Sequence, residues 1–254
     1  MCARDGFVLP LVINGFSVTA AYSREEAGII DELIDRIASL YNEGKTAIVF
    51  LAGPPGSGKS TLACVLEKRT KERRMPFRLC ALGLDGFHLK ASVLSSRRID
   101  LCGREMLLKD IKGRPETFNA EGFASSVAIL KDKGCALWPV YDRNAHDVSD
   151  ELLPASGDVF LIEGNWLLYD DERWGKARAL ADYTIAVRAD ETELRKRLVE
   201  RKMRGGKSKR EAEEWFENVD GPNVRLFSQN LVSPDFELVL ENGMLLKAGI
   251  QPCK

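Results

Sequence analysis

The sequence lacks any apolar stretch long enough to cross a membrane. A membrane-spanning helix needs about 18 to 20 consecutive apolar residues, and no run in this chain approaches that length. The segment from Met1 to Val12 contains Asp5 and does not have the basic and then long apolar layout of a secretory signal. We therefore expect a cytoplasmic protein that makes no use of a membrane.

The sequence also lacks an excess of charge and any close pair of cysteines. Its 37 Lys and Arg residues balance 38 Asp and Glu residues, for a net charge of −1. Nucleic-acid coating and polybasic membrane anchoring both need many uncompensated cations, so we expect neither. The 6 cysteines are scattered, which argues against a zinc site or a CxxC redox site. We expect these thiols to be reduced, and most of them to fill the core.

What is present is the composition of a folded globular chain. The 254 residues are 44% hydrophobic and 30% charged, values typical of soluble domains. No repeat, low-complexity tract or linker interrupts them, so we expect one domain over residues 1–254. Within it we expect an N-terminal accessory over residues 1–45 and a core over residues 46–245.

The accessory is predicted to be a hairpin followed by a helix. Residues 7–22 alternate apolar and polar side chains around Asn14-Gly15, a pair suited to a tight turn. Ser23 and Glu26 then form a capping-box pattern, and apolar residues recur at helical spacing as far as Gly44.

The core alternates short apolar runs with helical patterns. The expected strands are residues 47–52, 77–84, 136–141, 159–162, 183–187 and 237–240, and the expected helices are residues 59–70, 119–133, 190–204 and 209–219. Several of the runs lack alternation, as strands covered on both faces do. This order predicts an α/β fold, a Rossmann-like three-layer sandwich around a mostly parallel sheet.

A phosphate-binding loop follows the first core strand. It matches GxxxxGK[ST] in full over Gly53, Pro54, Pro55, Gly56, Ser57, Gly58, Lys59 and Ser60. The glycines let successive N–H groups point at phosphate oxygens, with the positive end of a helix behind them. Lys59 then reaches the β- and γ-phosphates and Ser60 binds Mg²⁺. The loop, together with Thr61, predicts a P-loop NTPase that binds ATP.

Two carboxylates stand at the ends of other predicted strands. Glu163 follows residues 159–162 and Asp85 ends residues 77–84. Ligands of open parallel sheets bind at this edge, so we expect both groups near Lys59. Glu163 is a candidate partner of the magnesium ion, and Asp85 is a candidate general base and a further candidate magnesium ligand. The alternatives are a Glu163 that merely meets solvent and an Asp85 that caps a glycine turn.

A basic helical pattern predicts a lid near residues 195–210. Arg197, Arg201 and Arg204 recur at i, i+4 and i+7, which puts three cations on one face. Such a face can close over the nucleotide, with Arg201 stabilising the transition state and Arg197 and Arg204 contacting ATP. The alternative is a solvated basic face paired with acids such as Glu200.

The order of these motifs, over about residues 47–240, resembles the family of phosphoribulokinase, uridine kinase and bacterial pantothenate kinase. The resemblance makes Asp85, in Asp85-Gly86-Phe87, the catalytic base. Uridine kinases carry a P-x-Y-D stretch with a histidine five residues after the tyrosine, contacting the nucleoside. Pro139, Tyr141, Asp142 and His146 reproduce that spacing.

The sequence looks most similar to a bacterial subgroup usually labelled only as nucleoside or nucleotide kinase-like. That subgroup carries G-x-P-E-T-F, E-G-N-W-L-L and a late P-N, which match residues 113–118, 163–168 and 222–223. The resemblance implies acceptor-side roles for Arg114, Phe118 and Asn165. Asn223 is a candidate contact of the nucleotide or, alternatively, a helix cap.

Some residues depart from the uridine kinase pattern. His88 and Leu89 stand where uridine kinases have Tyr-Arg, and Arg143 replaces an apolar residue after Tyr-Asp. These departures weigh against a nucleoside acceptor, although His88 and Arg143 remain candidates for contacting the acceptor. The cations between Asp85 and Phe118 could bind an anionic acceptor, or alternatively they could face solvent. They are Lys90, Arg97, Arg98, Arg104, Lys109, Lys112 and Arg114.

We therefore expect an ATP- and Mg²⁺-dependent kinase that phosphorylates a hydroxyl of a small metabolite such as a sugar, a sugar phosphate, a nucleoside or a pantothenate-like compound. One alternative is a nucleotide-dependent switch or assembly factor that binds a protein partner. Another is a nucleoside monophosphate kinase, in which Arg97, Arg98 and Arg114 would hold the acceptor's phosphate. The oligomeric state is left open, with a homodimer as one option.

Overall fold

The computed structural model describes residues 6–13, 16–101 and 103–248. Strands β1 (Phe7–Ile13) and β2 (Phe16–Tyr22) pair antiparallel over their whole length, with Phe7 opposite Tyr22. The predicted N-terminal hairpin is therefore confirmed, and its expected Asn14-Gly15 turn lies outside the described residues.

Helix α1 (Arg24–Ala38) follows the hairpin. Its capping box is formed as predicted, because Ser23 Oγ accepts from the Glu26 N–H at 3.3 Å and the Glu26 carboxylate accepts from the Ser23 N–H at 2.9 Å. The helix ends before the expected limit at Gly44. The apolar spacing runs on past its end because Tyr41, in the turns that follow, still packs against the core.

The main sheet has six strands in the order β12-β11-β10-β3-β9-β4. The first five strands in chain order run parallel to one another, and β12 is an antiparallel edge strand that the sequence did not predict. Their bounds are β3 (Ala47–Ala52), β4 (Leu79–Gly83), β9 (Val159–Gly164), β10 (Tyr183–Ala189), β11 (Phe236–Glu241) and β12 (Met244–Lys247).

Both faces of this sheet are covered. Every residue of β3 is buried, and successive side chains belong to different apolar clusters. Val49 and Leu51 pack on the side of α1 and the N-terminal hairpin, whereas Ile48 and Phe50 pack on the opposite side. Side chains alternate between the faces of a strand, so the two clusters are the two sides of one sheet.

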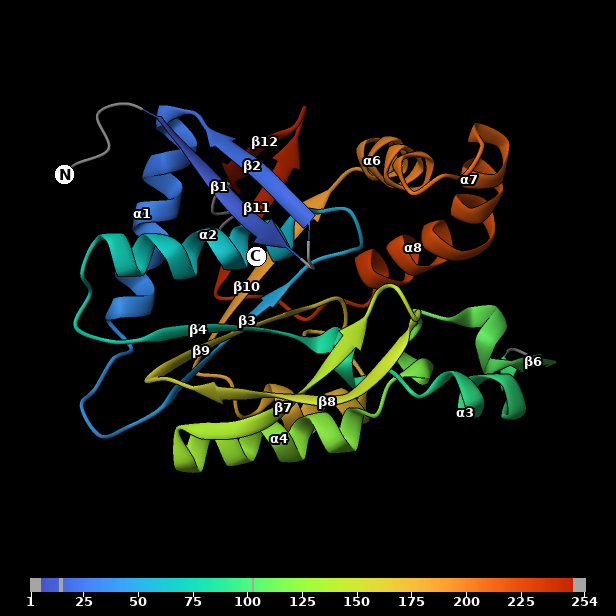
Figure 1. The fold of residues 1–254 in the computed structure, drawn as a ribbon, viewed down its shortest axis with the longest axis horizontal. Helices are drawn as coiled ribbons and strands as arrows, with labels where there is room; N and C mark the ends of the chain where they lie inside the picture. The colour runs from blue at the N-terminus through green and yellow to red at the C-terminus, as the bar shows by residue number, and fades with distance from the viewer. Residues whose placement is uncertain (1–5, 14–15, 102, 249–254) are drawn as a thin grey trace, which may run out of the picture.

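Helices complete the three layers (Figure 1). Helices α1 and α2 lie on one side and α4 and α5 on the other, while α6, α7 and α8 follow β10. The prediction of an α/β three-layer fold is confirmed. The bounds are α2 (Lys59–Glu72), α4 (Ala120–Lys133), α5 (Glu172–Arg178), α6 (Glu191–Arg204), α7 (Lys209–Trp215) and α8 (Gly221–Gln229). Within the described residues, no helix has both the length and the apolar character needed to cross a bilayer.

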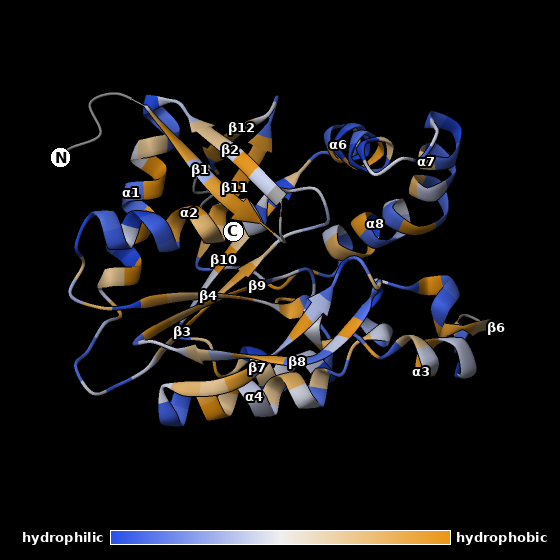
Figure 2. Cartoon of the chain, in the orientation of Figure 1, coloured by the Kyte–Doolittle hydropathy of each residue, from blue (hydrophilic) through white to orange (hydrophobic). Residues whose placement is uncertain are grey.

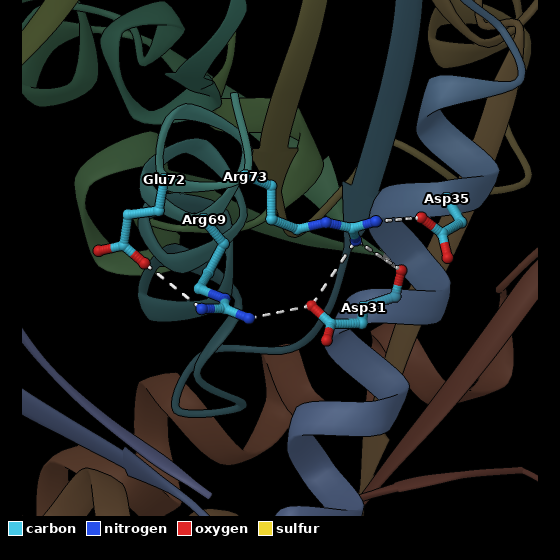
Figure 3. Close-up of polar contacts among 5 residues, drawn as sticks. All are labelled: Asp31, Asp35, Arg69, Glu72 and Arg73. Carbon is cyan, nitrogen blue, oxygen red and sulfur yellow. Dashed lines mark hydrogen bonds and ion pairs between the residues drawn. The ribbon is translucent and has the colours of Figure 1, made fainter. Parts of the chain in front are cut away.

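Ion pairs fasten the accessory to α2, the helix after the P-loop (Figure 3). Arg69 lies 3.2 Å from Asp31, and Arg73 lies 2.6 Å from Asp35. Arg73 also donates to the backbone carbonyl of Asp31 at 3.3 Å. The Arg69 side chain is only 16% exposed, so this contact is partly desolvated and holds α1 against α2 more firmly than a surface pair would.

One strand prediction was wrong in its placement. Strand β7 (Cys135–Asp142) does not join the parallel sheet but pairs antiparallel with β8 (Asp147–Ser156) in a separate hairpin. Its exposed and covered residues alternate because only one face is packed against the protein. The turn between Asp142 and Asp147 lets the strand pair with its immediate neighbour, and such local pairing competes with entry into the parallel sheet.

Smaller elements surround this hairpin. They are the 3₁₀ turns η1 (Leu84–Phe87), η2 (Leu108–Ile111) and η3 (Pro115–Thr117), helix α3 (Ala91–Ser96), and the strands β5 (Arg98–Leu101) and β6 (Arg104–Leu107). The helix expected over residues 209–219 is instead α7, a π-helical turn over Phe216–Asp220, and α8. Among the described cysteines, Cys64, Cys80 and Cys135 are free thiols, and Cys135 is exposed and does not fill the core.

Candidate active site

The P-loop connects β3 to α2 as the sequence predicted. Gly58 stands immediately before the helix with φ +84°, a left-handed conformation that favours glycine. The first turn of α2 carries no acidic residue, so its positive N-terminal end stays open to an anion. Pro54 is buried and Pro55 half-buried in the loop. The loop thus joins its strand and helix as predicted, and phosphate binding by its backbone stays a prediction.

Ser60 and Glu163 meet beside this loop. Leu51 of β3 lies opposite Glu163 of β9, so the neighbouring strands bring their ends together. Ser60 Oγ donates a hydrogen bond to Glu163 Oε1 at 2.8 Å. Burial raises the pKa of Glu163, and the charge of Lys59 opposes that shift. Two oxygen donors thus lie together at the start of α2.

Lys59 is the half-buried cation of the site. Burial lowers the pKa of Lys59, and the carboxylates of Glu163 and Asp85 oppose this effect. Arg201 and Arg143 act on the same ammonium group as repelling charges. These five charged groups therefore act on one another across one site, although they come from five different elements or loops.

Asp85 lies in η1, directly after β4 at the same edge of the sheet as Glu163. Arg143 Nη2 donates to Asp85 Oδ2 at 2.8 Å, and the two side chains are 39% and 44% exposed. The backbone at Gly86 packs so closely on β7 that an added Cβ would lie 2.0 Å from the carbonyl oxygen of Pro139. This contact seats the β7–β8 hairpin, and hence Arg143, over Asp85.

Three predicted acceptor-side rings gather next to Asp85. The His88 ring lies 3.8 Å from that of Phe118 and 5.4 Å from that of Tyr141, measured between centroids. His88 Nδ1 is 2.9 Å from the Asp85 carbonyl oxygen, which requires a proton on Nδ1. Burial lowers the pKa of His88, against the charge of Asp85. The rings form an apolar wall beside a carboxylate.

Other acceptor-side candidates lie further out. His146 is exposed, with φ +54° in the turn between β7 and β8, and its carbonyl accepts from Lys112 at 2.8 Å. Arg114 pairs with Glu116 at 3.2 Å rather than with a residue of the P-loop side. Asn165 is half-buried just after β9.

The other cations between Asp85 and Phe118 divide into paired and exposed ones. Lys90 pairs with Asp150, and Arg98 pairs with Glu105 at 3.3 Å. Arg97, Arg104 and Lys109 are exposed. Lys112 alone among these groups lies over the Tyr141 ring, with its Nζ 5.2 Å from the ring centroid. The structure thus brings Lys112, together with Arg143, to the acceptor side.

Helix α6 brings two of its three predicted arginines to the site. It is mostly hydrophilic (Figure 2) and buries only Leu194 and Leu198. Arg197 Nη1 donates to the Gly56 carbonyl of the P-loop at 3.3 Å. Arg204, by contrast, is 78% exposed and lies 3.8 Å from Glu200.

The charge of Asp220, a carboxylate that sequence reasoning missed, acts on Arg201. The residue as a whole keeps exposed surface, but protein atoms crowd its guanidinium, and this desolvation lowers the pKa of Arg201. Asp220, in the π-helical turn, is the strongest opposing charge. Asp220 is 9% exposed, and burial raises its pKa. The π-helical turn could have been suspected only from the Gly221-Pro222 pair that follows it.

Asn223 lies on the acceptor side. It is 4% exposed, and its Oδ1 has no hydrogen-bond partner among the described residues. Its Nδ2 lies 3.1 Å from the position of a Cβ built on Gly113, and the Gly113 carbonyl accepts from Trp166 Nε1 at 2.9 Å. The predicted nucleotide contact therefore packs against the segment between η2 and η3.

The chain has relatives among known proteins, although no family model matches it. It is 33% identical to the uncharacterized protein YggC of Escherichia coli over 225 residues, which are 87% of this chain and 91% of YggC. It is 29% identical over 215 residues to a Schizosaccharomyces pombe protein named provisionally as a uridine kinase, covering 82% of this chain and 89% of that protein.

Solved structures share its fold. A protein of Silicibacter described provisionally as a fructose transport system kinase matches with a TM-score of 0.72 and 28% identity, over 82% of this chain and 98% of that one. YFH7 of Saccharomyces cerevisiae matches with a TM-score of 0.63 and 16% identity, over 86% and 99% of the two chains, and shows the fold alone. The chain belongs to the same family as YggC, and it shares its fold with these two solved proteins, both described provisionally as kinases.

Proposed function

We propose that this protein is a kinase that transfers the γ-phosphoryl group of ATP to a hydroxyl of a small metabolite. The observation that carries the proposal is the meeting of Lys59, the Ser60–Glu163 pair and Asp85 at one edge of the main sheet. Phosphoryl transfer needs a phosphate cradle, charge stabilisation and a group that receives a proton, and these residues supply all three. The relative named provisionally as a uridine kinase and the solved structure described as a fructose transport system kinase support the same reaction class.

The P-loop would hold the phosphates of ATP. Its N–H groups and Lys59 face the β- and γ-phosphates, where negative charge develops as the bond to the leaving group breaks. Arg201 is a second cation for that charge, and the negative charge of Asp220 acts on it. The partial desolvation of Lys59 suits the role because water then screens its attraction for phosphate less than it would at the surface.

The donor set fits magnesium. Mg²⁺ prefers oxygen ligands and usually keeps several waters beside one or two carboxylates and the phosphates of the substrate. Ser60 Oγ and Glu163 Oε1 are such donors, 2.8 Å apart, and Asp85 is a further candidate. In the described part of the chain, no three His, Cys, Asp or Glu side chains form a group that could hold a metal ion by themselves. When bound, the ion neutralises charge on the phosphates.

Asp85 would act as the general base. It accepts the proton of the acceptor hydroxyl while that oxygen bonds to the γ-phosphorus and the bond from phosphorus to the ADP oxygen breaks. Arg143 holds the Asp85 carboxylate at 2.8 Å, and the cluster of His88, Phe118 and Tyr141 rings is joined to Asp85 through the His88 contact with its backbone carbonyl at 2.9 Å. The acceptor class remains a sugar, sugar phosphate, nucleoside or pantothenate-like alcohol.

A nucleoside monophosphate kinase finds less support. Such an enzyme needs several arginines around the phosphate of its acceptor. Arg97 is exposed, Arg98 pairs with Glu105, and Arg114 pairs with Glu116. A nucleotide-dependent switch needs no acceptor site, so it would not account for the residues gathered around Asp85.

The test is ADP release from MgATP with a panel of nucleosides, pantothenate, free sugars, sugar phosphates and glycerate. We expect one class of acceptor to stimulate release in the wild type, and Asp85→Asn to lower turnover by about 10² to 10⁴ while ATP binding persists. Asp150→Asn is the matched control, because Asp150 is 91% exposed on β8. Equal turnover in the Asp85 variant would remove this residue from the mechanism. ATP hydrolysis stimulated only by a protein partner would favour the switch.

A further inference from the structure

Lys112 is held on the acceptor side by groups that leave its charge uncompensated. Its Nζ donates to the His146 carbonyl at 2.8 Å and lies 5.2 Å from the centre of the Tyr141 ring. Neither of these groups carries a formal charge, and no carboxylate among the described residues lies within ion-pair distance of Lys112. The ammonium group is therefore fixed in position while its charge stays available to an anion.

The carboxylates at the turn between β7 and β8 are engaged by backbone groups. Asp142 Oδ1 accepts from the N–H groups of Asn144 and Ala145 at 2.7 and 3.1 Å. Asp147 Oδ1 accepts at 2.9 Å from the N–H of Ala91, the first residue of α3, and α3 lies just beyond this end of the hairpin in Figure 1. These two carboxylates stabilise the turn and its contact with α3, and neither neutralises the ammonium group that is bound to the same turn.

Arg143 is the second cation of this turn. Among the described residues its guanidinium bonds only to Asp85, through Nη2, and both side chains of the pair are about two-fifths exposed. Water screens such a pair, so another anion can replace the carboxylate at little cost. A guanidinium carries five N–H donors in one plane, which match two oxygens of a phosphate or a carboxylate.

Positive charge exceeds negative charge around the His88 ring. Burial lowers the pKa of His88, and the charge of Asp85 opposes this shift. The charges of Lys112 and Arg143 add to the lowering of the same pKa, so both cations act on one ring. That ring lies 5.4 Å from the ring of Tyr141, over which the Lys112 ammonium group is held. Two cations and one carboxylate therefore surround the place where the acceptor must present its hydroxyl.

We propose that Lys112 and Arg143 bind an anionic group of the acceptor, so that the substrate is an alcohol that also carries a phosphate or a carboxylate. This inference rests on the proposed function for the reaction and for Asp85 as its base. The anionic group takes the place of Asp85 as the partner of Arg143, which leaves the Asp85 oxygens open to the proton of the hydroxyl. A neutral alcohol brings no charge to exchange for that of the carboxylate, so it leaves the ion pair in place. The anionic group is bound and is not itself phosphorylated.

The test compares acceptors that differ in one anionic group. Ribose is paired with ribose 5-phosphate and glycerol with glycerate, and kcat/KM for each compound is measured from ADP release with MgATP. Lys112→Met removes the uncompensated charge and keeps a side chain of similar length. Lys109→Met is the matched control, because Lys109 is exposed in η2, three residues earlier. The affinity of each variant for MgATP shows that it has folded.

We expect the wild type to prefer the anionic member of at least one pair by about tenfold or more, as one charge-assisted hydrogen bond allows. Lys112→Met should reduce that preference by about tenfold, and Lys109→Met should keep it. A preference within the ribose pair identifies the anionic group as a phosphate, and one within the glycerol pair identifies it as a carboxylate. A wild type that prefers neither anionic member, or a preference that Lys112→Met leaves unchanged, would overturn the proposal.

Calorimetry gives a second readout that needs no turnover, so the two proposals can fail separately. Ribose 5-phosphate and glycerate are titrated into protein whose P-loop is saturated with magnesium and a non-hydrolysable ATP analogue. We expect the Kd of the anion that binds to rise about tenfold in Lys112→Met and to stay the same in Lys109→Met. Binding that depends on Lys112 without phosphorylation of any acceptor would retain the anion site and reject the kinase. Phosphorylation of the neutral alcohols alone would retain the kinase and reject the anion site, and a wild type that binds neither anion would reject that site as well.

Discussion

On the nucleotide side of the site, every group comes from the main sheet or from the helix that follows its strand. Lys59 and Ser60 begin α2, and Glu163 ends β9, the neighbour of β3. On the acceptor side, Asp85 and Asn165 follow sheet strands, whereas Arg143 comes from the turn of a separate hairpin. The nucleotide side is therefore built into the main sheet. The acceptor side depends partly on a separate hairpin, whose residues can vary without disturbing the sheet.

The two halves also differ in their contact with water. Lys59 and Glu163 are desolvated, and burial shifts the pKa values of both toward the neutral forms. The side chains of the Asp85–Arg143 pair are about two-fifths exposed, so water screens their attraction. Separating the two side chains therefore costs little free energy. Under the proposed function, an acceptor would displace Arg143 from Asp85 at little cost, while the phosphates would meet a site that is already formed.

The largest effect on activity is expected from a substitution on the nucleotide side. Lys59→Met removes the desolvated cation nearest the transferred group, and we expect kcat to fall by about 10³. The measurement is ADP release at saturating acceptor. Lys71→Met is the matched control, since Lys71 lies on the same helix and is 65% exposed. A loss below tenfold would mean that the nucleotide side does not dominate catalysis.

A smaller effect is expected on the acceptor side. Arg143→Gln should raise KM for an anionic acceptor by about tenfold, the value of one charge-assisted hydrogen bond, and leave KM for MgATP unchanged. The measurement compares a sugar phosphate with the free sugar. Arg98→Gln, on exposed β5, is the control. An increase in KM for MgATP instead would assign Arg143 to the nucleotide side and erase the contrast.

The smallest effect concerns stability and pH. Burial lowers the pKa of His88, so the unfolded chain takes up a proton before the folded one as pH falls below about 6.5. Stability is therefore expected to be lost on acidification, as a lower urea midpoint at pH 5.5 than at pH 7.5. His88→Gln should reduce this difference, and His146→Gln, at an exposed position, should not. If wild type, His88→Gln and His146→Gln show the same difference in urea midpoint between the two pH values, the surroundings of His88 are as hydrated as the Asp85–Arg143 pair.

Sequence reasoning succeeded where structure is local and failed where it is not. The P-loop was predictable because its strand, turn and helix are consecutive, and the capping box at Ser23 for the same reason. Strand β7 was misplaced because an alternating run does not reveal whether its partner is a sheet or its own hairpin.

Contacts between distant segments explain the remaining misses. The Asp85–Arg143 pair joins residues 58 positions apart, and the Arg197–Gly56 contact joins residues 141 apart. Arg204 shares a helical face with Arg197, but seven residues carry it about 10 Å further along the axis, where it is 78% exposed. Helical spacing gives the direction of a side chain and not the depth of the protein beneath it.

The bond from Leu245 to Glu26 spans 219 positions, and this separation imposes an order in time. During synthesis the hairpin and α1 emerge long before β12. The hydrogen bond between Glu26 and the Leu245 N–H can therefore form only after the intervening sheet strands have been made. Closure of so long a loop is slow and comes late in folding. Newly made chains would thus form the P-loop first and the contact between α1 and β12 last.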